Sequence, residues 1–223
     1  GEVQMVPKGI DPGFAYNPGR TALSGNAAAV MAGKLVDAPP ALGASMGAAM
    51  RFAANPLRGH CAAWLTERLD ALEQGKPIQA GGRIVIGALG QDVVDYCMPP
   101  GRPPRVALES AAITVSDAGV VHMYNAAKRA TSRGVPRDVL ERLADVLANP
   151  DAIFLDAGAG RDPVLLYVVD LGEREGKFVV QLTKARKERG GDGARRRIVT
   201  NEVWSASVLS RGGSFNPGEM ERI

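Results

Sequence analysis

The residues best suited to chemistry gather on one short segment in the second half of the chain. The segment "SDAGVVHMYNAAKRATSRG", residues 116–134, combines an imidazole, an amide and several cations: His122, Asn125, Lys128, Arg129 and Arg133. Cleaving RNA without a metal requires a base for the 2′-hydroxyl, a proton donor for the leaving oxygen, and cations or amides around the phosphate. These side chains suit that reaction, although the same pattern also fits a solvated polar helix face.

Polar residues also interrupt two runs that read as strands. Gln181 and Thr183 share one face of the run 177–185, and Lys184 follows them. In the run 197–206, alternation places Asn201 and Ser205 on the face opposite to Thr200, Glu202 and Trp204. Half-exposed sheets often carry such residues, and the register, which the sequence does not fix, decides whether Asn201 or Thr200 faces a cleft.

The positive charge is concentrated in one stretch. Residues 1–100 carry eight basic and eight acidic side chains, so the net charge of +3 arises downstream, where 184–197 reads "KARKERGGDGARRR". One interpretation is a phosphate-binding loop, and charge alone favours the other, a solvated hairpin tip. The candidate nucleic-acid contacts are Arg133, Arg186, Lys187, Arg189, Arg195, Arg196 and Arg197.

Helical periodicity and capping signals predict the elements that must position these groups. Helices are expected over 21–37, 56–73, 117–133 and from Pro136 to Asn149. On the third of these, one face carries Val120, Val121, Tyr124, Ala127 and Thr131. His122, Asn125, Arg129 and Arg133 lie opposite, and Lys128 stands at the edge. On one continuous helix His122 and Lys128 would lie about 120° apart, so they could converge only if the lysine stem bends or the helix meets the sheet obliquely.

Four β-branched runs follow, "AIFLDA", "VLLYVVDL", "KFVVQLTKA" and "RIVTNEVWSA", joined by short connections that predict antiparallel hairpins. The expected fold class is therefore α+β: a helical N-terminal region, then two helices packed on a four-stranded antiparallel sheet with its other face free.

The proline-rich stretch "CMPPGRPPR", 97–105, predicts a domain boundary because it can continue neither a helix nor a central strand. We expect a mainly helical spacer or docking region over 21–100, a linker over 101–105, an α+β domain over 106–210 and a tail over 211–223. "GGRIVIGAL" in the first region reads as one short strand.

Several function classes find no support in the sequence. No apolar run approaches the roughly 20 residues needed to cross a bilayer, so no membrane association is expected. Two cysteines without a C-x-x-C pair and two histidines predict reduced thiols and no metal site. No phosphate-loop, G-x-S-x-G or H-E-x-x-H motif is present, and no cofactor is expected.

The first of two resemblances rests on "GIDPGFAYNPGR", 9–20, which holds two Pro-Gly turns. It resembles the segment that closes the head-morphogenesis domain of Mu-like phage minor head proteins, so residues 1–20 would be the end of that domain. The leading Gly1 is typical of tag removal and suggests the C-terminal part of a longer protein. The resemblance implies location in the virion and the host cytoplasm, with phage portal or capsid proteins as partners of the N-terminal region.

The second resemblance covers about 106–210 and rests on "ITVSDAGVVHMYNAAKRA" and "TNEVWS". This part is similar to the C-terminal domains of such proteins that are grouped with barnase, EndoU, colicin and RelE ribonucleases, which need no metal. The resemblance implies a site made of His122, Lys128, Thr183, Lys184, Asn201 and Ser205. In the resulting hypothesis His122 is the base, Lys128, Arg129 and Lys184 are the cations, and Thr183, Asn201 and Ser205 are orienting groups. This sequence departs from the family pattern at Asn125, where an arginine is expected, and at Thr183, where an asparagine is expected. Arg129 could replace the missing cation.

Three hypotheses follow. The first is an RNase-like effector that cleaves RNA, tRNA being one possible substrate, by 2′-hydroxyl attack, with a possible immunity protein as its neutralising partner. The second is a non-catalytic capsid or portal-associated protein whose sheet binds nucleic acid or an internal partner. The third is another small toxin enzyme, such as a nucleotidyl- or ADP-ribosyl-transferase.

Overall fold

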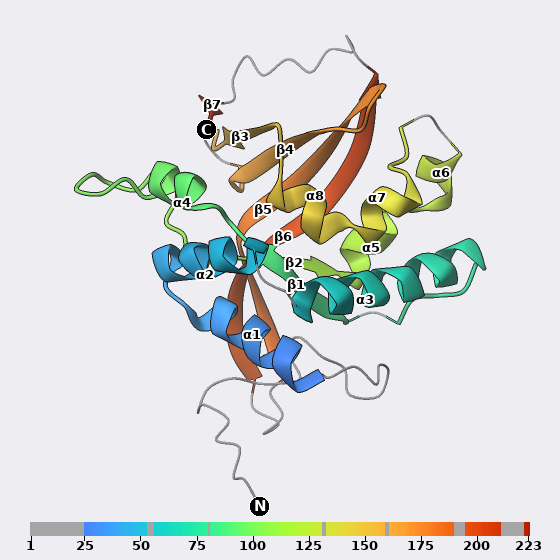
Figure 1. Ribbon diagram of the computed structural model, residues 1–223, viewed down its shortest axis with the longest axis horizontal. Coiled ribbons are helices and arrows are strands. Elements are labelled where there is room, and N and C mark those ends of the chain that lie inside the picture. The colour runs from blue at the N-terminus through green and yellow to red at the C-terminus, as the bar shows by residue number, and fades with distance from the viewer. Residues whose placement is uncertain are drawn as a thin grey trace, which may run out of the picture.

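A computed structural model describes residues 25–52, 56–79, 81–130, 133–158, 161–189, 195–210 and 221–223. Helices and strands alternate irregularly along this part of the chain (Figure 1). The helices are α1 (Gly25–Asp37), α2 (Pro40–Phe52), α3 (Pro56–Glu73), α4 (Gln91–Cys97), α5 (Asp117–Met123), α6 (Ala126–Arg129), α7 (Arg137–Glu141) and α8 (Leu143–Ala148). The strands are β1 (Arg83–Ala88), β2 (Ala112–Ser116), β3 (Ala152–Asp156), β4 (Val164–Asp170), β5 (Arg174–Arg189), β6 (Arg195–Ser210) and β7 (Glu221–Arg222).

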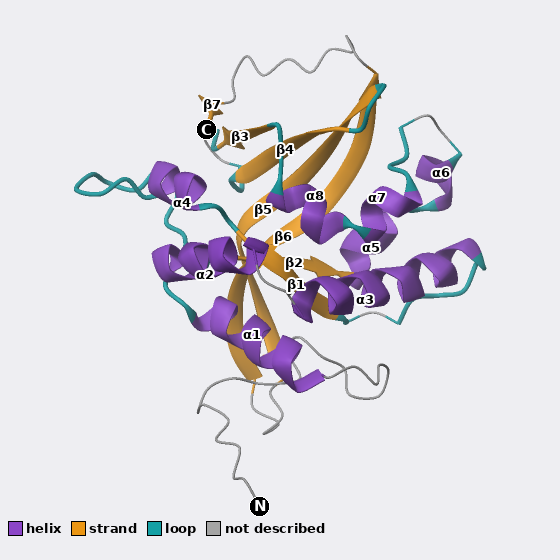
Figure 2. Cartoon of the chain, viewed as in Figure 1, coloured by secondary structure: helices purple, strands orange, loops and turns teal. Residues whose placement is uncertain are grey.

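The strands form one seven-stranded mixed sheet in the order β1-β2-β6-β5-β4-β3-β7 (Figure 2). Strands β3, β4, β5 and β6 pair antiparallel in sequence order, as the short connections between them require. Strand β2 pairs parallel to β6, with Ile113 beside Asn201 and Val115 beside Val203. Strand β1 adds to the outer side of β2, and the short β7 adds to β3.

Both faces of the sheet are covered where β1, β2 and β6 meet. Ile84, Ile113, Val115 and Val203 point into the main core, which they share with Trp64 and Leu65 of α3, Val120 of α5 and Leu143 of α8, among others. Val85, Ala112 and Ile198 point to the opposite face and pack with Leu35 of α1 and Leu57 of α3. Because neighbouring residues of a strand point to opposite faces, the two sets define two layers.

The predicted fold, two helices on a four-stranded antiparallel sheet, is therefore wrong. The sheet has seven strands and one parallel pair, because β1 and β2 extend it beyond β6 and β7 extends it beyond β3. Strand β2 escapes prediction because its five residues, "AITVS", run directly into the cap of the next helix. Helices α2 and α4 are likewise absent from the sequence-based expectation.

Two predicted helices are each divided in two. The segment 117–133 forms α5 and α6 with a break at Tyr124 and Asn125, and the following helix forms α7 and α8 with a break at Arg142. The first break decides the geometry of the candidate site, as described below. Residue 131, placed on the apolar face by prediction, lies outside the described residues, and Val121 of the same face is exposed.

The proline-rich stretch 97–105 lies between two parts of the same core. Cys97 and Leu89 before it pack in one cluster with Val106 and Ile113 after it. Strand β1 from the first region also pairs along its length with β2 from the second. The predicted boundary at this stretch therefore does not separate two hydrophobic cores.

A buried ion pair fixes α5 against α3 and the start of β1. Asp117, the first residue of α5, accepts a hydrogen bond from Arg68 Nε at 2.7 Å and another from the amide of Gly82 at 2.5 Å. The guanidinium of Arg68 also lies 3.7 Å from the ring centroid of Trp64. These contacts hold the helix that carries His122 at a defined position on the sheet.

Candidate active site at the free edge of β6

The candidate site lies where β6 continues past the end of β2. The parallel pairing of β2 covers only Asn201 to Val203, so none of the described strands pairs with β6 after Val203 on that side. The Ala206 carbonyl and the Val208 amide there bond to Lys128 and Arg133. Helix α5 starts directly at the end of β2, capped by Ser116, whose hydroxyl accepts from the amide of Gly119. A Cβ at Gly119 would lie 2.7 Å from the carbonyl of Val203, so glycine lets α5 approach this edge closely.

A β-bulge sets the directions of the β6 side chains at this point. Val180 pairs with Val203, but Val179 pairs with Ser205, so Trp204 is the extra residue. The core residues of β6 show the same shift. Val203 and Ala206 both face the main core although they are three positions apart, whereas Ala206 and Val208 have the usual spacing of two. The prediction that Ser205 shares a face with Asn201 is therefore wrong, since simple alternation fails across a bulge.

His122 packs against the bulged residue. Its ring stacks on that of Trp204, with the centroids 5.4 Å apart and the planes inclined by 21°. Partial desolvation lowers the pKa of His122, and the nearby positive charge of Lys128 lowers it further. Because its pKa lies below the ordinary 6.5, the imidazole is mainly neutral at pH 7, as a general base requires, and it is exposed to solvent.

Lys128 reaches the same edge from α6. Its ammonium donates to the Ser205 hydroxyl at 3.3 Å and to the Ala206 carbonyl at 3.1 Å. Partial burial lowers the pKa of the ammonium. The contact with Ala206 satisfies a carbonyl on the free edge of β6, so Lys128 has a structural role as well as a chemical one. The structure thus places His122, Lys128 and Ser205 near one another.

Asn125 is the residue that makes this convergence possible, and the sequence-based reading gave it no such role. Its side-chain oxygen accepts from the amide of Lys128 at 2.9 Å and caps α6, while its amide nitrogen donates to the carbonyl of His122 at 3.2 Å. The chain therefore turns between the two helices. The predicted angle of about 120° applies to one continuous helix and not to this pair of helices. The signal for the turn was asparagine's preference for N-cap positions.

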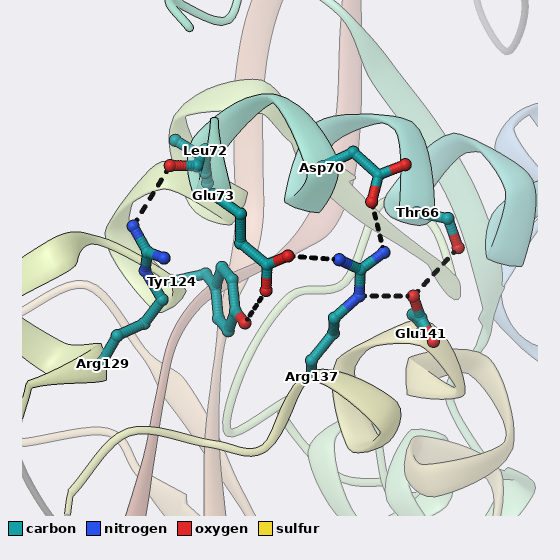
Figure 3. Close-up of polar contacts among 8 residues, drawn as sticks. All are labelled: Thr66, Asp70, Leu72, Glu73, Tyr124, Arg129, Arg137 and Glu141. Carbon is teal, nitrogen blue, oxygen red and sulfur yellow. Dashed lines mark hydrogen bonds and ion pairs between the residues drawn. The ribbon is translucent and has the colours of Figure 1, made fainter. Parts of the chain in front are cut away.

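Arg129 points away from the site, toward the end of α3. It donates to the Leu72 carbonyl at 3.1 Å and lies over the ring of Tyr124 (Figure 3). Beside it, the Tyr124 hydroxyl donates to Glu73, and burial together with this hydrogen bond raises the pKa of Tyr124 to about 12. The predicted replacement of a missing phosphate-binding arginine by Arg129 therefore has no geometric basis.

Figure 3 also shows that Glu73, which accepts from Tyr124, belongs to a polar network between α3 and α7. Arg137 binds Asp70, Glu73 and Glu141, each at 2.5 to 2.9 Å. Thr66 completes the network by donating to Glu141 at 3.3 Å. These contacts join the two helices.

Asn201 and Thr183 lie elsewhere on the sheet and bond to the backbone. Asn201 is buried, and its amide donates to the carbonyls of Ser110 and Ala112, which anchors the start of β2. Its oxygen accepts from the amide of Thr183 at 3.2 Å. Thr183 stands at a second bulge with φ +52°, rare for a β-branched residue. Lys184 follows it, opposite Thr200. None of the hydrogen bonds of Asn201 and Thr183 leads to His122.

The basic stretch forms the far end of β5 and β6. Arg186 binds the buried carboxylate of Glu202 with contacts of 2.8 and 3.0 Å, and Arg197 binds Glu109 at 2.6 and 2.8 Å. Lys187, Arg195 and Arg196 are exposed, and Arg189 is placed by its backbone pairing with Arg195. Arg133 lies at the other end, where its carbonyl accepts from the amide of Val208.

Other chemical groups in the described residues do not gather into a second reactive centre. Burial raises the pKa of Cys61 to about 12 and that of Cys97 to about 11, so both thiols stay protonated. The part of the chain that the structure describes has no cluster of three or more His, Cys, Asp or Glu placed to hold a metal ion. Among its helices, none combines the length and apolar character that crossing a bilayer requires.

Comparison with known proteins gave no match: no family model, no curated protein and no solved structure is similar to this chain. The candidate site therefore rests on its own geometry. Residues 9–20, which carry the resemblance to phage head proteins, lie outside the described residues, so the expected virion location and the portal or capsid partners stay predictions.

Proposed function

We propose that the chain is a metal-independent, ribonuclease-like effector whose reactive groups are His122, Lys128 and Ser205 at the free edge of β6. The observation that carries the proposal is the convergence of a neutral imidazole, an ammonium and a hydroxyl at one exposed edge. Trp204 adds an aromatic ring beside the imidazole, the type of side chain on which single-stranded bases stack.

In the proposed reaction, His122 takes the proton of a ribose 2′-hydroxyl, and the 2′-oxygen attacks the adjacent phosphorus. The bond from phosphorus to the 5′-oxygen breaks, which leaves a 2′,3′-cyclic phosphate and a free 5′-hydroxyl. We assign the Lys128 ammonium, whose pKa is lowered, to stabilise the crowded phosphate and to protonate the leaving oxygen. The hydroxyl of Ser205, already held by Lys128, orients the phosphate.

The test is cleavage of a labelled single-stranded RNA by the purified full chain in excess EDTA. The expected products carry a cyclic phosphate, and a substrate with 2′-deoxyribose at the cleaved position stays intact. His122→Ala is expected to reduce the rate by about 10²-fold or more, the typical contribution of a general base. Lys128→Gln should also reduce it, whereas Lys34→Gln, a matched change at an exposed lysine of α1, should leave it unchanged.

A second candidate function is non-catalytic binding of nucleic acid in a phage capsid. The observation that favours it is that Asn201, Thr183 and Arg129, three of the expected catalytic residues, are engaged in contacts with the backbone or with Tyr124. RNA that is bound by the wild-type chain but stays intact in EDTA would support this candidate and contradict cleavage.

A further inference from the structure

The far end of β5 and β6 is a two-stranded ribbon that extends beyond the rest of the sheet. The pairing of β4 with β5 ends at Gln181, and that of β2 with β6 begins at Asn201. Strands β5 and β6 stay paired from Lys184 and Thr200 to Arg189 and Arg195. In Figure 2 these strand ends pass behind α1 and run on below the sheet.

One face of the ribbon is covered by α1 and neutralised by acidic groups. Ile198 packs on the cluster that contains Leu35 of α1. Arg186, directly opposite Ile198, is bound by Glu202. Arg196 lies on the same face, two residues from Ile198, and its charge acts on Asp37 at the end of α1, where it offsets part of the rise in pKa that burial causes. The two arginines of this face thus have nearby carboxylates.

The opposite face is cationic and exposed. Lys187 and Arg197 are direct cross-strand partners, and Arg195 lies two positions further along β6 on the same face. All three side chains are exposed. Like charges directly opposite each other destabilise a sheet, so the Lys187–Arg197 pairing favours the binding of an anionic group.

One carboxylate already occupies part of this face in the manner of a phosphate. Glu109, in the loop before β2, binds both terminal nitrogens of Arg197, at 2.6 and 2.8 Å. Planar, two-point binding of this kind is how arginine also recognises phosphate oxygens. Both side chains of the pair are about half exposed, so a ligand can compete with the carboxylate.

We propose that the face formed by Lys187, Arg195 and Arg197 binds the phosphate backbone of single-stranded RNA and that Glu109 competes with that RNA for Arg197. This inference rests on the proposed function for the choice of RNA and assigns the binding to one face of the ribbon. Arg186 and Arg196, which the sequence places in the same basic stretch, serve the fold on the other face. Removal of the Glu109 charge therefore tightens RNA binding.

The test measures binding of a fluorescent 2′-O-methyl RNA of 20 nucleotides by anisotropy, using the full chain at several salt concentrations. This RNA has no free 2′-hydroxyl, so binding is measured apart from cleavage. Lys187→Gln with Arg195→Gln is expected to weaken binding at least tenfold and to reduce the slope of log affinity against log salt by about 1.4, because two phosphate contacts are lost. Glu109→Gln is expected to tighten binding several-fold.

The matched control is Arg196→Gln, which removes one charge from the covered face and is expected to change affinity less than threefold. Equal weakening by changes on both faces, or no gain from Glu109→Gln, would overturn the inference. If the expected salt slope and the expected difference between the two faces are found but ordinary RNA is not cleaved, the binding inference is supported and only the proposed reaction is refuted. If ordinary RNA is cleaved and the Lys187, Arg195 and Glu109 variants change neither cleavage nor binding, the proposed reaction is supported and the binding inference is refuted.

Discussion

At the scale of single residues, His122 and Lys128 are coupled electrostatically, and the coupling can be measured directly. Desolvation and the ammonium both lower the pKa of His122. We expect NMR titration of its ring proton to give a pKa below the ordinary 6.5. The base-dependent arm of RNA cleavage should then rise with pH through that lowered value and level off above it, because only the neutral imidazole accepts a proton.

The control for this titration removes the ammonium charge. Lys128→Gln should shift the pKa of His122 upward, since one of its two causes of depression is gone. The chain has only two histidines, so His122→Gln assigns the signal without ambiguity. A titration that Lys128→Gln leaves unchanged would show that the two groups do not interact.

Thr183 supplies a second prediction at this scale. A β-branched residue with φ +52° is strained, and glycine adopts this conformation without steric strain. We expect Thr183→Gly to increase the free energy of unfolding by about 0.5–1 kcal/mol, measured by urea denaturation, with Thr183→Val giving no gain. RNA cleavage should stay within about threefold, because the amide and not the side chain of Thr183 binds Asn201. Loss of cleavage in Thr183→Gly would restore the catalytic role that the resemblance implied.

At the scale of elements, the turn between α5 and α6 decides whether His122 and Lys128 meet. Asn125 bonds to both helices, so Asn125→Ala removes the α6 cap and one contact at the end of α5. We expect a loss of about 1 kcal/mol in unfolding free energy, the usual cost of a lost N-cap. Cleavage should fall by a larger factor than this stability loss explains, because the two reactive groups separate.

Asn125→Asp provides the matched comparison, since it keeps the capping oxygen and loses the donor to His122. We expect Asn125→Asp to retain most of the stability and an intermediate rate in the RNA cleavage assay. Equal rates in wild type and Asn125→Ala would mean that the turn does not position the site.

The elements also show what the sequence could predict and what it could not. Hydrophobic periodicity and capping residues predicted α3 and the strands β3 to β6, because a long apolar pattern or a short turn fits few other structures. They did not reveal the parallel pairing of β2, which depends on residues distant in the chain, or the bulge at Trp204, which reverses the facing of Ser205 relative to Asn201. His122, Lys128 and Ser205 lie close together because the Asn125 turn divides the segment that the pattern predicted as one continuous helix.

At the scale of the whole molecule, the main core crosses the proline-rich stretch. Residues 106–223 alone would lack β1, α3 and α4, and would expose the core residues Ile113 and Val120. We therefore expect this fragment to be unfolded or aggregated, and residues 25–223 to unfold in one cooperative transition by circular dichroism and calorimetry. A fragment with a sharp transition of its own would show that 106–223 is an independent domain.

The parallel pairing of β2 with β6 has a consequence for the order in which the molecule assembles. Asn201 bonds to the carbonyl of Ala112, 89 residues away along the chain, whereas β5 and β6 meet across a short hairpin. Contacts that close so large a loop form slowly, because the entropy of closure is lost before the pairing is gained. Since α5 begins at the end of β2, His122 reaches Trp204 only after this pairing, and a newly synthesised chain would acquire its reactive edge late in folding.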